Sequence, residues 1–250
     1  MRHPKLTLGT VAVSLCFAVQ TMAQSISTSP HNLNNAPVSI SPNGHGTTGE
    51  ICLPCHTPHS APYNSGALLW NHDVNLSKTY TMYTSVHVTQ NSGAGGSSSN
   101  PQLDNTSRLC LSCHDGAIAV DAYGKATTGT FTLGTAAGTS WAAIAGAGDN
   151  DLSADHPLGV GYPGLTATVD SLGNITSESW TKTVGWNDPT ASTFTQGGVD
   201  GLPAVNLVYL PGNGLVGIGC ETCHDPHDNT AGFVRMNNSG SVLCLKCHNK

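Results

Sequence analysis

The sequence has few charged and few large apolar side chains. Of its 250 residues, 10% are Asp, Glu, Lys or Arg, 38% are hydrophobic and 6% are aromatic, while Gly alone accounts for 29. Because the chain is short of the Leu, Ile, Val and Phe that build a core, aliphatic packing is not expected to fill its interior unaided. The formal net charge is −6. Nucleic-acid binding requires clustered Lys and Arg, so this class of function is excluded.

A long apolar run is also missing. Residues 6–19 form an apolar stretch of 14 residues, whereas a helix across a bilayer needs about 20. Arg2 and Lys5 precede this stretch and small residues around Ala23 follow it, which is typical of a secretory signal peptide. We therefore predict a signal peptide at residues 1–23 and an exported protein at residues 24–250. We expect it to be extracellular or at the cell surface, alternatively periplasmic, with no membrane anchor.

Cysteine and histidine are abundant, with nine Cys and 12 His. Cys16 lies in the predicted signal peptide, and the other eight Cys all fall in Cys-x-x-Cys pairs that are followed directly by His. The four motifs consist of Cys52, Cys55 and His56; Cys110, Cys113 and His114; Cys220, Cys223 and His224; and Cys244, Cys247 and His248. Eight Cys in an exported protein normally indicate four disulfides.

The His after each pair indicates another chemistry. Cys-x-x-Cys-His is the attachment signature of c-type haem, in which the two thiols add to the two vinyl groups of the porphyrin. The following His then lies beneath the ring and reaches the iron as the proximal ligand. The spacing from Cys220 to Cys247 also approaches that of a zinc ribbon, but zinc leaves His224 and His248 unexplained. The motifs therefore predict four covalently bound haem c groups.

The remaining His residues supply candidates for the second iron ligands. Beyond the motifs, residues 24–250 contain His31, His45, His59, His72, His87, His156 and His227, with only Met82 and Met236 as alternative ligands. His on both faces of each iron is therefore possible by number, and such ligation favours a low potential. His59 and His227 end two Cys-His-x-Pro-His sequences. Because the first His of each sequence occupies one face of its own ring, we expect the second to ligate a neighbouring haem.

These segments resemble a known family. The sequence is similar to the extracellular tetrahaem cytochromes that polymerise into conductive filaments (the OmcE type), within the wider cytochrome c3-like group with doubled CXXCH motifs. The resembling segments are 31–34, 52–59, 69–71, 80–83, 110–116, 155–157, 220–227 and 233–248. The resemblance implies that His31, His59, His156 and His227 are the four distal ligands. It also implies that an adjacent subunit contributes one ligand, for which His31, in a Pro- and Asn-rich N-terminal arm, is the candidate.

We expect the fold of a multihaem cytochrome c: mostly loops, short helices at the haem motifs, a few β-strands and a core formed by haems. Residues 24–250 are predicted to form a single tetrahaem cytochrome domain, with a Gly/Ser/Thr-rich insertion at about 120–215. Within this insertion, short strands are expected near 130–133. Residues 166–169 and 175–184 flank Gly173-Asn174 and predict a β-hairpin.

The predicted function is electron transfer through four bis-His haems, with no catalysis. The protein is expected to form the subunit of an extracellular filament, with copies of itself, other redox proteins or extracellular acceptors as partners. A monomeric periplasmic electron shuttle is the alternative. A multihaem reductase is a further one, but it needs an open or Lys-ligated haem, and no Cys-x-x-Cys-Lys motif occurs.

Overall fold

The computed structural model describes the C-terminal half of the chain more completely than the N-terminal half. The described residues are 26–33, 51–61, 69–75, 78–83, 103–124, 144, 150–171, 174–191, 194–196, 199–202, 205, 207–210, 215–236 and 238–249. The predicted signal peptide and the strands expected near 130–133 lie outside these residues. Within them, no helix has both the length and the apolar character needed to span a bilayer.

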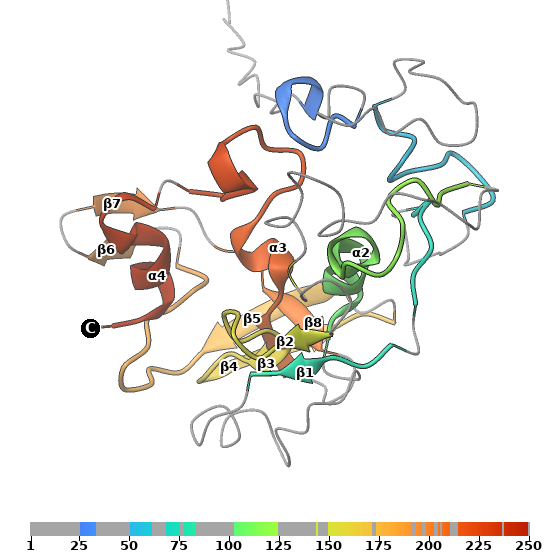
Figure 1. The fold of residues 1–250 in the computed structure, drawn as a ribbon. Helices are drawn as coiled ribbons and strands as arrows, with labels where there is room; N and C mark the ends of the chain where they lie inside the picture. Colours follow the sequence, from blue (N-terminus) through green and yellow to red (C-terminus); the bar gives the residue numbers. More distant parts are fainter. Residues whose placement is uncertain are drawn as a thin grey trace, which may run out of the picture.

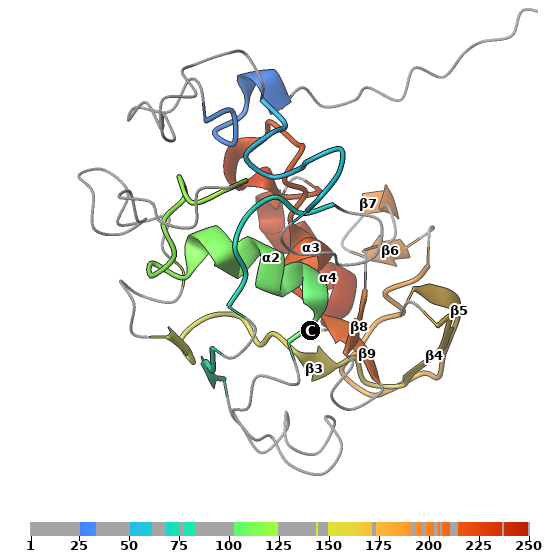
Figure 2. The same ribbon diagram turned by 90° about the vertical axis from the view of Figure 1, so that its right-hand side faces the viewer.

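Helices are few and short. The α-helices are α2 (Asn105–His114), α3 (Cys220–Cys223) and α4 (Val242–Cys247), and the 3-10 helices are η1 (Ile26–Thr28), η5 (Ala231–Phe233) and η6 (Ser239–Ser241). Helix η1 lies on the opposite side of α2 and α3 from the strands β4 and β5 (Figures 1 and 2). This low helix content confirms the expected loop-rich architecture of a multihaem cytochrome.

The strands are equally short and form small, separate sheets. They are β1 (Thr81–Met82), β2 (Asp151–Leu152), β3 (Val160–Gly161), β4 (Leu165–Val169), β5 (Ile175–Trp180), β6 (Phe194–Gln196), β7 (Val199–Leu202), β8 (Val208–Leu210) and β9 (Leu215–Ile218). Strand β1 pairs with β2 in parallel, and β3, β9 and β8 form an antiparallel sheet in that order. Two antiparallel hairpins, β4–β5 and β6–β7, complete the set.

The hairpin expected in the insertion is confirmed. Strands β4 and β5 pair antiparallel, and Asp170 and Asn174 exchange hydrogen bonds at the turn. Strand β5 ends at Trp180, earlier than the predicted residue 184. One further hydrogen bond, from Thr181 N to Gly164 O at 2.8 Å, follows the strand, and the chain then turns between Thr183 and Trp186. Gly164 is required there, since its φ is +78° and a Cβ would lie 2.2 Å from Thr181 O.

The chain builds two apolar clusters, which its composition did not predict. The larger combines Tyr162, Leu165, Val205, Leu207, Val216, Ile218 and Met236. The smaller combines Tyr80, Met82, Leu103, Leu111 and Leu152. The chain can build the larger cluster from few large apolar residues because most of them come from one stretch, around strands β3 to β9. The predicted insertion therefore contributes to the interior and is not merely a peripheral elaboration.

Helix α2 is held at its start by a buried cap that also contacts α3. The Asp104 carboxylate accepts a hydrogen bond from Ser107 N at 2.7 Å, which satisfies an otherwise unpaired N–H of the first helical turn. The Ser107 hydroxyl in turn accepts from Cys220 N at 2.9 Å. The start of α2 and the start of α3 are thus joined through one buried serine.

We expect Asp104→Asn to stabilise the protein more at neutral than at acidic pH. Burial raises the pKa of Asp104, although the Ser107 hydrogen bonds oppose this. A carboxyl group with a raised folded-state pKa stabilises the fold fully below its unfolded pKa, and this contribution is lost as pH rises through the folded pKa. Asn caps a helix about as well as Asp and does not ionise. Urea denaturation at about pH 4 and about pH 7 measures the difference in unfolding free energy between the variant and the wild type. If this difference does not grow with pH, the prediction is wrong.

Candidate haem-binding site

Each Cys-x-x-Cys-His motif forms a single helical turn. Residue His114 ends α2, and His224 and His248 are the residues that follow α3 and α4. The first motif lies in turns and not in a helix, but His56 N still donates to Cys52 O at 2.8 Å, as in a helical turn. Positions i, i+3 and i+4 of one turn share a face. Both thiols and the imidazole of each motif are therefore positioned to meet one ligand.

The eight motif Cys residues are all free thiols in this structure, so the disulfide alternative is not realised. Burial raises the pKa of several of them, mainly by disfavouring the charged thiolate. The pKa of Cys55 and of Cys113 rises to about 12, and that of Cys247 to about 11. Within the described ranges, no group of three or more His, Cys, Asp or Glu side chains is arranged to hold a metal ion.

Thiols of consecutive motifs lie next to one another. After burial, the nearby Cys113 thiol is the next cause of the raised pKa of Cys55. The thiols of Cys110 and Cys220 share a hydrogen bond, which raises the pKa of Cys110 and lowers that of Cys220.

The third and fourth motifs also have neighbouring thiols. After burial, the Cys244 thiol is the next cause of the raised pKa of Cys223. The first two motifs are also joined by Trp70, whose indole N–H donates to Ser112 Oγ at 3.3 Å. Each motif therefore has a thiol near a thiol of the next motif in the sequence.

Three motif imidazoles lie opposite a second imidazole. The ring centroids of His56 and His227 are 6.2 Å apart, those of His114 and His31 are 6.1 Å apart, and those of His248 and His156 are 6.4 Å apart. Two imidazoles on opposite sides of one metal, each with its nitrogen about 2 Å away, place their centroids about 6 Å apart. The spacing of each pair therefore fits an iron ligated from both sides, and each pair joins a motif His to a distal His predicted from the sequence.

Backbone carbonyls hold several of these rings in the orientation that ligation needs. The Nδ1 atoms of His31, His156 and His224 lie 3.0, 3.2 and 2.7 Å from Pro226 O, Pro157 O and Gly232 O, respectively. An Nδ1–H that donates to a carbonyl fixes the tautomer that leaves Nε2 for a metal.

The protonation state of His31 also suits ligation. Burial lowers the pKa of His31, and the nearby His114 and His227 lower it further, while the hydrogen bond to Pro226 opposes this. The neutral imidazole, which is the ligating form, is therefore favoured.

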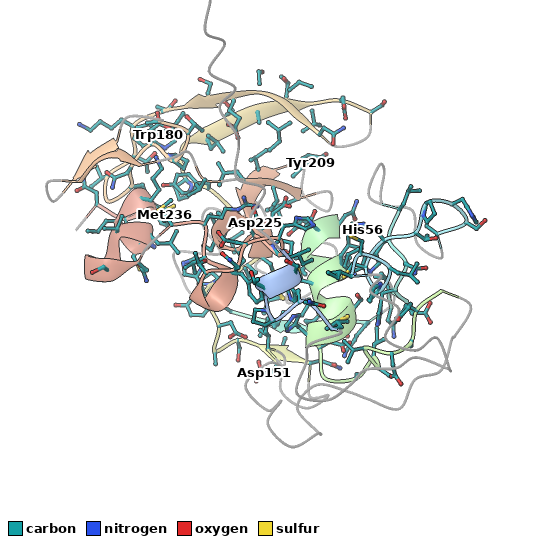
Figure 3. All side chains as sticks on the ribbon, turned by 90° about the horizontal axis from the view of Figure 1, so that it is seen from above. His56, Asp151, Trp180, Tyr209, Asp225 and Met236 are labelled. Carbon is teal, nitrogen blue, oxygen red and sulfur yellow. The ribbon has the colours of Figure 1, made fainter. Side chains whose placement is uncertain are left out.

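The ring of His227 has a carboxylate neighbour instead of a carbonyl. Its Nδ1 lies 3.5 Å from Asp225 Oδ1, and Asp225 Oδ2 lies 3.4 Å from Arg235 Nη1. Figure 3 shows His56 and Asp225 from above, and the ring of His227, two residues after Asp225, has its centroid 6.2 Å from that of His56. The ligand pair of the first motif therefore lies beside a carboxylate that is itself close to Arg235.

Two predicted ligands are not paired in this way. His224 and His59 are exposed, and neither lies opposite another imidazole of the described residues. His45 and His87 lie outside the described residues. That His59 ligates an iron stays a prediction.

The structure gives His72 a different role. Its side chain is buried, with 1% of its surface exposed. One ring nitrogen lies 3.1 Å from Asp73 O and the other 2.9 Å from Ala119 O. With both nitrogens against carbonyl groups, His72 connects two loops and has no nitrogen left for a metal.

Two aromatic residues beside the ligands were not predicted to act there. The Phe233 ring stacks on His31 with centroids 4.2 Å apart and planes 12° apart. The Trp186 ring lies 4.8 Å from that of His248. Neither residue belongs to a motif, and no spacing in the sequence connects Phe233 with His31, which lies about 200 positions earlier.

Short helical turns that end in Cys-x-x-Cys-His, together with imidazoles about 6 Å apart, are compatible with a multihaem c-type cytochrome. Residues 214–250, which contain the third and fourth motifs, match the family model of the doubled CXXCH motif. A comparison with curated proteins finds no match. The doubled motif supports a multihaem c-type cytochrome, indicates covalently bound c-type haem and suggests haem-binding electron transfer.

Proposed function

We propose that the protein carries electrons along four covalently bound haem c groups and transforms no substrate. The observation that carries this proposal is the set of three imidazole pairs, each 6.1–6.4 Å between centroids and each containing a motif His. Haem supplies the reversible one-electron couple when bound. The Cys thiols would attach each ring at two points, and the paired imidazoles would ligate the iron and favour a low potential.

The nearness of thiols from consecutive motifs supports a path for electrons in the order of the sequence. Cys55 lies near Cys113, Cys110 contacts Cys220, and Cys223 lies near Cys244. Because each ring would be attached through the thiols of its motif, the nearness of these thiols would bring adjacent rings close to one another. An electron that enters at the first motif is then expected to leave at the fourth, or the reverse.

We further propose that the haem rings complete the interior. Neither apolar cluster includes a residue of the described segments 26–33 and 51–61, which carry His31 and His56. These segments are held by a few hydrogen bonds, such as Asn229 Nδ2 to Thr28 Oγ1 at 3.1 Å. Covalent attachment and ligation would supply the missing anchorage for both.

The filament is the more specific form of this proposal, in which exported copies of the chain join end to end. The sequence made His31 the inter-subunit candidate, but His31 lies opposite His114 of its own chain. We therefore favour His59 as the ligand that one copy donates to the His224 iron of the next. His59 is exposed and holds the same place in its Cys-His-x-Pro-His sequence as His227, whose ring does face another motif.

Electron microscopy of the culture medium, with the holoprotein expressed from its full-length gene, tests the filament. Wild type and His31→Ala are expected to form filaments, whereas His59→Ala is expected to remain monomeric with four haems by mass spectrometry. Filaments from His59→Ala but not from His31→Ala would restore His31 as the inter-subunit ligand. Wild type that stays monomeric in the periplasm would favour the shuttle, and turnover of an oxyanion at a high-spin haem would favour the reductase.

A further inference from the structure

Two consecutive residues of η5 adopt left-handed backbone conformations. The φ of Gly232 is 73° and that of Phe233 is 56°. Gly adopts such angles freely, but a bulky residue does so only where its surroundings impose them. Here Asp225 N donates to Phe233 O at 2.8 Å, Phe233 N donates to Thr230 O at 2.9 Å, and Arg235 N donates to Cys223 O at 2.9 Å. The turn is therefore held rigidly against the third motif.

The side chain of Phe233 uses this conformation to cover one ligand ring. It stacks on His31 with centroids 4.2 Å apart and planes 12° apart. The hydrogen bond to Pro226 O fixes one edge of the His31 ring, but the ring still has to be prevented from rotating about its bond to a metal. The flat face of Phe233 supplies that second constraint.

The backbone of the same turn orients a second ligand. Gly232 O lies 2.7 Å from His224 Nδ1, the shortest of the Nδ1 contacts to a carbonyl in the candidate site. His31 serves the second motif through its pairing with His114, and His224 belongs to the third. These two motifs also touch through Cys110 and Cys220. One strained turn thus contacts ligands of two neighbouring haem sites.

We propose that Phe233 is a positioning residue that sets the plane of the His31 imidazole, and that the Gly232-Phe233 turn links the ligand geometry of the second and third haem sites. This inference rests on the proposed haem binding. The planes of His31 and His114 are 67° apart and those of His156 and His248 are 63° apart, whereas those of His56 and His227 are 18° apart. Nearly perpendicular ligand planes leave two iron d orbitals almost equal in energy, which produces a strongly anisotropic low-spin signal. Nearly parallel planes separate these orbitals and produce a rhombic one.

Electron paramagnetic resonance (EPR) of the oxidised, monomeric holoprotein tests the role of Phe233. The variants Phe233→Leu and Phe233→Gly both remove the aromatic face, and the glycine also relieves the backbone strain, so that folding is retained in at least one of them. Both are expected to shift one of the two strongly anisotropic components, that of the His31–His114 pair, and to leave the other one and the rhombic component unchanged. Phe233→Tyr keeps the stack and is expected to restore the wild-type spectrum.

A second measurement reports how firmly His31 is held. Loss of the stacked pair is expected to raise the apparent affinity of the reduced protein for added carbon monoxide roughly 2- to 10-fold at one haem. Wild-type EPR spectra in both the Leu and Gly variants, with unchanged carbon monoxide affinity, would overturn the inference. A wild-type protein without covalent haem would instead overturn the proposed function, so the two failures are distinguishable.

Discussion

Replacing His227 with alanine is expected to leave one haem with a single protein ligand and to raise its reduction potential. His227 faces His56 at 6.2 Å, and its Nδ1 lies 3.5 Å from the Asp225 carboxylate, which adds negative charge to this ligand. Axial ligands tune haem potentials over about 0.8 V, so the loss of this imidazole is expected to raise one potential by on the order of 0.1 V. EPR will show a new high-spin signal, and spectroelectrochemistry will show one transition at higher potential.

His59→Ala is the matched control, because His59 ends the other Cys-His-x-Pro-His sequence. In the monomeric holoprotein this substitution is expected to leave the spectrum and the potentials unchanged, since no described imidazole lies opposite His59. The opposite pattern, with a new high-spin signal in His59→Ala and none in His227→Ala, would contradict the pairing of His56 with His227.

Replacing Lys78 with methionine is expected to cost about 3–5 kcal/mol of unfolding free energy, the typical cost of leaving a buried charge without its partner. Lys78 Nζ lies 2.6 Å from Asp115 Oδ2, and the two side chains are 9% and 0% exposed. The other Asp115 oxygen accepts hydrogen bonds from the N–H groups of Ala117 and Ile118, at 2.8 and 3.0 Å. The unpaired carboxylate would therefore remain buried beside His114. Guanidinium denaturation of the holoprotein, followed by circular dichroism, measures the loss.

Two further variants make this prediction specific. Lys182 is exposed, so Lys182→Met removes a positive charge without leaving a buried partner and is expected to change the free energy by less than about 0.5 kcal/mol. The double variant Lys78→Met/Asp115→Asn removes both charges and is expected to recover part of the loss. Equal stabilities of Lys78→Met and Lys182→Met would show that the ion pair contributes nothing.

The sequence was enough to predict those features that form between residues close together in the chain, which are the motif turns and the β4–β5 hairpin. Two thiols and one imidazole within five residues need only one helical turn to share a face, and each motif forms such a turn. The β4–β5 hairpin was predictable for the same reason, because its turn residues and β-favouring flanks lie together in the sequence.

Only the tertiary structure decided which imidazoles face each other. His227 is three residues from His224 but lies opposite His56, and His31 lies opposite His114 and beneath Phe233. Such pairs form when segments more than 80 residues apart in the sequence pack together. The spacing of neighbouring residues does not indicate which of these distant segments will meet. The apolar clusters and the roles of His72 and Phe233 also depend on the tertiary structure. Burial and ring stacking arise when distant segments pack together, so the order of neighbouring residues does not indicate them.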